Sequence, residues 1–159
     1  MLDTNLQNNT ALVQSSNFIV EQPSTKKDFE IYYKLRYEVL RKPWHQPLGT
    51  EVDNTDGESI HAFIKIDNIA IACARLHFTD NLTAQMRSMA VHPNYQGKGI
   101  GKQIIAYLEG IAQKNNCNKI ILHARKNAVK FYESCGYSVK EKSYLLFNEI
   151  QHYLMEKVV

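Results

Sequence analysis

The stretch from Val91 to Ala112, VHPNYQGKGIGKQIIAYLEGIA, decides the fold of this 159-residue chain. It follows an apolar segment, passes through a Pro-Asn turn and a glycine-rich loop, and then carries apolar residues four, four and three positions apart, at Ile100, Ile104, Leu108 and Ile111. This order predicts a strand, a loop and a helix that packs one face on a sheet.

The loop between strand and helix has the features of a phosphate-binding site. Gly97, Gly99 and Gly101 lack Cβ atoms, so a ligand could approach the backbone closely. The first N–H groups of a helix have no partner within it, and such termini bind anions. Lys98 and Lys102 add positive charge on the same turn. We therefore expect a phosphate-bearing ligand here, although the glycines could also serve only a tight turn.

Two common phosphate motifs do not fit the loop. A P-loop needs a glycine five residues before its Gly-Lys pair and Ser or Thr after it, but Gln96 and Gln103 occupy those places. The dinucleotide motif G-x-G-x-x-G would need a glycine at position 102, which is a lysine. A generic nucleotide-phosphate enzyme is therefore disfavoured. The spacing that fits is Gln-x-x-Gly-x-Gly, at Gln96, Gly99 and Gly101.

This spacing resembles the pyrophosphate-binding motif of the GCN5-related N-acetyltransferase (GNAT) family. A second segment, NAVKFYESCGY at residues 127–137, is similar to the family's A-x-x-F-Y-x-x-x-G-[FY] helix, in which the tyrosine faces the sulfur of coenzyme A. That tyrosine is Tyr132 here, whose alternative is a core role. The resemblance covers residues 18–159. It implies a mixed α/β fold, the GNAT acyl-CoA N-acyltransferase fold, with a central, mostly antiparallel sheet flanked by helices.

The resemblance also implies an activity, an N-acetyltransferase that moves an acetyl group from acetyl-CoA to a primary amine without a metal. Tyr132 would donate a proton to the leaving thiolate. Asn127 would bond the pantetheine arm, or else cap a helix. The implied cofactor-binding residues are Met89, Ala90, Val91, Gln96, Gly97, Lys98, Gly99, Ile100, Gly101, Lys102, Asn127 and Tyr132. The alternative is a non-catalytic coenzyme-A-binding or interaction module on the same fold.

The residue that accepts the proton of the amine stays open. The candidates are Glu51, Asp53, Asp56, Glu58, His61 and His152, or a chain of water molecules. The acids of the long loop would attract a cationic amine, and Arg36, Trp44 and Arg75 could line the amine site. The acceptor could be a small molecule or an amine of a protein or peptide.

Local patterns predict the remaining elements. We expect a short strand at 18–21, a helix capped by Ser24 or Thr25 and stopped by Pro43, and an irregular loop at 41–59. A hairpin turns at Asp67-Asn68, and strands follow at 83–91 and 119–124. Asn127 would cap a short helix that ends at Gly136, before closing strands at 137–140 and 150–157.

Composition narrows the class of protein. Hydrophobic residues make up 44% and charged residues 22%, the values of an ordinary globular protein. A net charge of +3 with scattered Lys and Arg argues against nucleic-acid binding, and no apolar run is long enough for a membrane span. Three cysteines indicate neither a disulfide framework nor a zinc site. We expect a cytoplasmic monomer or homodimer with a flexible tail at 1–17 and one domain at 18–159.

Overall fold

The computed structural model describes residues 18–159, so the predicted tail at 1–17 lies outside the described residues. One sheet has the strand order β1-β2-β3-β4-β6-β5. The strands are β1 (Ile60–Ile66), β2 (Ile69–Phe78), β3 (Thr83–Val91), β4 (Lys119–Arg125), β5 (Ser138–Leu146) and β6 (Ile150–Val158). Neighbouring strands are antiparallel except for the parallel pair β3 and β4. The predicted fold class, a mostly antiparallel sheet flanked by helices, is confirmed.

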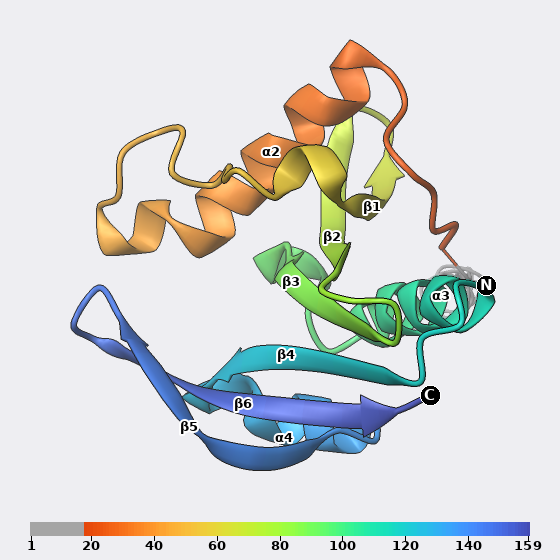
Figure 1. The fold of residues 1–159 in the computed structure, drawn as a ribbon. Helices are drawn as coiled ribbons and strands as arrows, with labels where there is room; N and C mark the ends of the chain where they lie inside the picture. Colours follow the sequence, from red (N-terminus) through yellow and green to blue (C-terminus); the bar gives the residue numbers. More distant parts are fainter. Residues whose placement is uncertain (1–17) are drawn as a thin grey trace, which may run out of the picture.

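The sheet opens between β3 and β4. These strands pair only from Thr83 to Gln85 and from Lys119 to Ile121. Beyond this short register each strand continues to its own end, while β3 stays paired with β2 and β4 with β6. Main-chain groups on the facing edges of β3 and β4 are therefore left without a strand partner, and Figure 1 shows the two strands diverging.

Three helices cover the sheet. Helix α2 (Lys26–Leu40) packs on one face of β1, β2 and β3, around Tyr32 and Phe63. Helix α3 (Ile100–Lys114) packs on the opposite face of the same strands. Helix α4 (Val129–Ser134) contacts β4 and β5, and its Tyr132 belongs to the same apolar cluster as α3. Figure 1 shows α2 beside the β1–β3 half and α4 beside the β4–β6 half.

Several local predictions hold for identifiable reasons. Thr25 caps α2 in a reciprocal capping box with Asp28. The β1–β2 hairpin turns at Asp67 and Asn68, with Asp67 in the left-handed region at φ 53°. Gly136 follows α4 with φ 93°, a conformation that glycine adopts without strain.

Three other predictions need correction. The segment 18–21 is not a strand, because it contributes a single bridge from Glu21 to Phe63. Asn127 does not cap α4: it lies inside a 3₁₀ turn, Lys126–Ala128, and the N-cap is Ala128, whose side chain makes no capping bond. Strand β5 extends to Leu146, well past position 140, because pairing with β6 keeps its polar and exposed residues in the strand. The loop at 41–59 is irregular apart from 3₁₀ turns at Lys42–Trp44 and Asp56–Glu58.

Candidate active site

A cavity of about 720 Å³ occupies the region where β3 and β4 diverge. The glycine loop, the start of α3 and residues of α4 line one part, and the end of α2 with residues of β4, β5 and β6 line another. Every predicted cofactor residue except Lys98 lines this cavity. Lys98 instead holds its ammonium 5.4 Å from the ring centroid of Tyr95. The structure therefore brings together two motifs that lie far apart in the sequence.

The glycines of the loop have two different roles. Gly97 and Gly99 adopt left-handed backbone conformations, with φ 74° and 76°, and Gly99 is the N-cap of α3. Gly101 is buried, and a Cβ there would lie 3.0 Å from Cζ of Phe131. Gly101 thus also lets α3 pack against α4, in addition to lining the cavity. Gln96 ties the loop to β3 by donating from Nε2 to the carbonyl oxygen of Val91 at 3.1 Å.

Tyr132 lies on α4 with only 8% of its surface exposed. Its ring packs at 5.1 Å from that of Phe131 and 6.0 Å from that of Tyr137, between ring centroids. The side chain lines the cavity, and its hydroxyl makes no hydrogen bond with any of residues 18–159. Burial raises the pKa of this hydroxyl well above its ordinary value, so the group is protonated at neutral pH.

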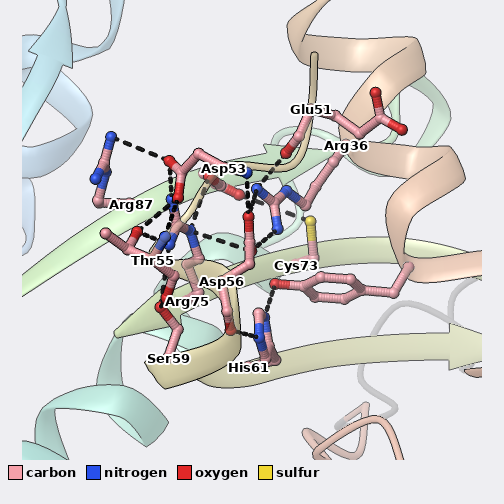
Figure 2. Close-up of polar contacts among 12 residues, drawn as sticks. Arg36, Glu51, Asp53, Thr55, Asp56, Ser59, His61, Cys73, Arg75 and Arg87 are labelled. Atoms are coloured by element: carbon pink, nitrogen blue, oxygen red, sulfur yellow. Dashed lines mark hydrogen bonds and ion pairs between the residues drawn. The ribbon is translucent and has the colours of Figure 1, made fainter. Parts of the chain in front are cut away.

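Two acids of the long loop, Asp53 and Asp56, form ion pairs with arginines. Figure 2 shows Arg36 donating to both carboxylate oxygens of Asp56, at 2.6 and 3.3 Å, and to the main-chain oxygen of Glu51. Asp53 lies 2.7 Å from Arg75 and 3.4 Å from Arg87. Burial alone would raise the pKa of Asp56, but the hydrogen bond and the charge of Arg36 lower it.

Asp53 and Asp56 are consequently held in ion pairs within the fold. Glu51, Asp53, Asp56 and Glu58 do not line the cavity, and neither do Arg36 and Arg75. The lining of the cavity therefore gives no support to the expectations that the loop acids attract a cationic amine and that the two arginines line the amine site, and both stay predictions. Trp44 does not line the cavity either, but its ring lies 4.3 Å from the guanidinium of Arg125, which does.

His61 is also held by the surrounding protein. Its Nε2 lies 2.9 Å from the main-chain oxygen of Asp56, so Nε2 must donate, and Nδ1 accepts from the hydroxyl of Tyr32 at 2.7 Å. Burial lowers the pKa of His61, which favours this neutral form. Both ring nitrogens are engaged, and His61 does not line the cavity.

His152 is the one proposed proton acceptor among these side chains that lines the cavity. Its Nδ1 lies 2.9 Å from the carbonyl oxygen of Ile150, which can only accept, so Nδ1 carries the hydrogen and Nε2 the lone pair of the neutral ring. The ring stacks on that of Tyr144 with centroids 4.5 Å apart. Burial lowers the pKa of His152, and the nearby charge of Arg125 acts in the same direction.

Several cavity residues were missed by reasoning from the sequence, namely Arg41, Arg87, His123, Arg125 and Tyr144. A partial signal existed for two of them. In β4, Leu122 and Ala124 are buried while His123 and Arg125 alternate with them, which places these polar side chains on the opposite face of the sheet. Arg41 and Tyr144 come from a helix end and a hairpin whose proximity only the fold reveals.

Two kinds of feature are absent from the described residues. Within 18–159, no cluster of three or more His, Cys, Asp or Glu side chains could hold a metal ion. No helix in the same range combines the length and apolar character needed to cross a membrane.

Comparisons with known proteins agree with the geometry. The model of the acetyltransferase (GNAT) family matches residues 28–137. An uncharacterised N-acetyltransferase, YjcF of Bacillus subtilis, is 27% identical over 125 residues, which cover 79% of this chain and 89% of that protein. Glucosamine 6-phosphate N-acetyltransferase 1 of Dictyostelium discoideum is 34% identical over 83 residues, covering 48% of this chain and 52% of that protein.

Solved structures show the same fold. A GNAT family acetyltransferase from Elizabethkingia anophelis, crystallised with acetyl-CoA bound, superposes with a TM-score of 0.75 at 16% sequence identity. The superposition covers 91% of this chain and 100% of that one.

Proposed function

Because the chain belongs to the acetyltransferase (GNAT) family, we propose that it transfers an acetyl group from acetyl-CoA to a primary amine by direct attack in a ternary complex. The observation that carries this proposal is the cavity at the β3–β4 opening, since it joins a phosphate-binding loop to a buried tyrosine and to a histidine with an available lone pair.

The cofactor would bind from the α3 and α4 side. The N–H groups of the first turn of α3 receive no side-chain cap from Gly99, and together with Lys102 they form a binding site for the pyrophosphate. The unpaired edge of β3, at Met89 to Val91, would bond the pantetheine arm and the thioester oxygen. Asn127, no longer required as a helix cap, would bond the same arm from the turn before α4.

The acceptor amine would approach from the α2 side. His152 stands directly opposite Arg125 in the β4–β6 register, so the two side chains share the face of the sheet that is turned away from the Leu122 and Ala124 core. Amine and cofactor would thus meet in the opening between β3 and β4 rather than exchange in one binding position, as a ternary complex requires.

The reaction needs two proton transfers. The amine nitrogen attacks the thioester carbon, its proton passes to Nε2 of His152, and main-chain N–H groups stabilise the developing oxyanion. The carbon–sulfur bond then breaks, and the hydroxyl of Tyr132 protonates the departing thiolate. A raised tyrosine pKa keeps that proton in place until a thiolate appears, and a lowered histidine pKa keeps Nε2 able to accept.

Calorimetry with acetyl-CoA and thiol release on a panel of amines test this proposal. We expect acetyl-CoA binding and amine-dependent thiol release, whereas binding without thiol release would favour the non-catalytic module.

Tyr132→Phe tests the acid. General acid catalysis contributes on the order of a hundredfold or more, so kcat should fall by about that factor with near-normal acetyl-CoA affinity. Tyr107→Phe is the matched control, because among residues 18–159 the Tyr107 hydroxyl accepts a hydrogen bond only from Gln22. Unchanged turnover in Tyr132→Phe would remove Tyr132 from the mechanism.

His152→Gln tests the base. The variant should lose most of kcat and the acidic limb of the pH–rate profile, because the group that titrates has been removed. His77→Gln on β2, outside the cavity, is the matched control. A pH profile identical to that of the unaltered protein would assign the proton transfer to water or to another group.

A further inference from the structure

The cavity carries an excess of positive charge. Four of its lining residues are Arg or Lys, and within the described part of the chain none of its lining residues is Asp or Glu. Lys102 belongs to the phosphate loop, and Arg87 shares the carboxylate of Asp53 at 3.4 Å. Arg41 and Arg125 remain, and neither forms an ion pair with any carboxylate of residues 18–159.

These two guanidinium groups converge on one point. Nη1 of Arg41 and Nη2 of Arg125 both donate to the carbonyl oxygen of Leu40, at 3.0 and 3.3 Å. Arg41 also donates from Nε to the main-chain oxygen of Thr50 at 3.0 Å. The other guanidinium N–H groups of Arg41 and Arg125 donate no hydrogen bond to any of residues 18–159.

Aromatic rings hold both guanidinium groups in place. The Arg125 group lies 4.3 Å from the ring centroid of Trp44, and the Arg41 group lies 5.5 Å from that of Phe147. The two positive charges also repel: the pKa of Arg125 is lowered by burial and then by the charge of Arg41. An arrangement of this kind suits an anion, since a carboxylate or phosphate matches the planar guanidinium geometry.

From this geometry we propose that the acceptor amine carries an anionic group, a carboxylate or a phosphate, which binds between Arg41 and Arg125. This inference rests on the proposed function and deepens it. The amine would lie at the β3–β4 opening near His152, while the anion occupies the mouth formed by the end of α2 and the β5–β6 hairpin. Polycationic amines are excluded as preferred acceptors, because they would add charge to an already positive cavity.

The test compares acceptors that differ only in the anion. Glucosamine 6-phosphate is paired with glucosamine, and glycine with glycinamide, while spermidine represents the polycations. We expect kcat/KM for the better anionic acceptor to exceed that of its uncharged partner by roughly 10–100-fold, the usual worth of hydrogen bonds to a charged group. The two pairs also distinguish phosphate from carboxylate.

Variants then assign the preference to the two arginines. Arg125→Gln and Arg41→Gln should each remove most of the preference for the anionic partner while leaving the KM for acetyl-CoA unchanged. Lys114→Gln, at the exposed end of α3, is the control and should change neither value. A rise in the KM for acetyl-CoA would show that the arginines serve the cofactor and would overturn the proposal.

A measurement on the unaltered protein avoids any dependence on variant folding. With coenzyme A at saturation, glucose 6-phosphate or acetate should raise the melting temperature and inhibit competitively against the amine, whereas glucose should do neither. Equal or better use of uncharged or polycationic amines, or the absence of binding by both anions and both anionic amines, would overturn the proposal. If acetyl-CoA itself fails to bind and no amine releases thiol, the proposed function fails instead.

Discussion

Two groups of arginines in this protein differ in whether the fold gives them a carboxylate partner. Arg36 and Arg75 are almost fully buried, and each has an aspartate of the long loop within 2.7 Å (Figure 2). Arg41 and Arg125 are half-buried, hydrogen-bond only main-chain oxygens within residues 18–159, and lie against aromatic rings. The first group stabilises the fold, and the second leaves a positive charge at the cavity mouth.

Charge pairing, not residue type, therefore distinguishes these two groups of arginines. A buried ion pair is costly to break because the remaining charge stays uncompensated. A half-buried guanidinium without a carboxylate should cost little stability to remove, because its removal relieves repulsion. Its loss should mainly weaken the binding of a ligand.

The largest expected effect is on stability, from Arg36→Met. This change leaves the buried Asp56 carboxylate without its partner, and breaking such a pair costs about 3–5 kcal/mol. Urea denaturation of the variant and of the unaltered protein measures the difference. A loss below about 1 kcal/mol, the size expected for an exposed pair, would show that Arg36 contributes no more to stability than Arg41 is expected to.

A smaller effect concerns pH. The pKa of His61 in the folded protein is lowered, so between that value and the unfolded pKa, about 6.5, the unfolded chain binds more protons. The stability from neutral His61 is therefore fully present above the unfolded pKa and is lost as pH falls through the folded pKa. The lowered pKa of Asp56 continues the same trend at lower pH.

Denaturation midpoints measured from neutral pH downward test this sign. His61→Gln should flatten the upper part of the profile, and His77→Gln on β2 is the control. A protein that became more stable on acidification through this range would contradict the neutral, doubly hydrogen-bonded assignment of His61.

Arg41→Gln should change stability little, by about 1 kcal/mol or less in either direction. It loses bonds to two carbonyl oxygens, which a glutamine can partly replace, and it removes the repulsion between Arg41 and Arg125. The same urea measurement that is applied to Arg36→Met checks this value. A loss as large as that of Arg36→Met would show that Arg41 is a structural residue.

The smallest effect is the response to salt. Raising ionic strength from about 0.05 to 0.5 M shortens the screening length severalfold, so the KM for an anionic acceptor should rise by a few fold. The free energy of unfolding should change little, because the Arg36–Asp56 pair is shielded from solvent. A KM for the anionic acceptor that is independent of salt would argue against an electrostatic site at the cavity mouth.

Much of the architecture could be predicted because it follows from local rules. The strand, glycine loop and helix around Gly99 are encoded by consecutive residues, as are the capping box at Thr25 and the turn at Asp67. Predictions failed where a neighbour in space decides the outcome. The end of β5 depends on its partner β6, and Asn127 lies in a turn that the end of β4 dictates.

The site divides in the same way. The cofactor half could be proposed from the chain itself, because a phosphate loop and a short helix are continuous motifs whose members lie a few residues apart. The acceptor half joins the end of α2, the end of β4 and the β5–β6 hairpin, so its members are separated by up to about a hundred positions and share no spacing.

The amino-acid sequence thus determined the family, the order of most elements and the position of the glycine loop that we propose to bind phosphate, because these depend on contacts between near neighbours in the chain. Tertiary structure alone decided which charges find partners. Asp53 and Asp56 of the long loop meet Arg36, Arg75 and Arg87, whereas Arg41 and Arg125 meet two carbonyl oxygens and two aromatic rings. The electrostatics of the acceptor site are set by such distant pairings, and no local pattern of residues encodes them.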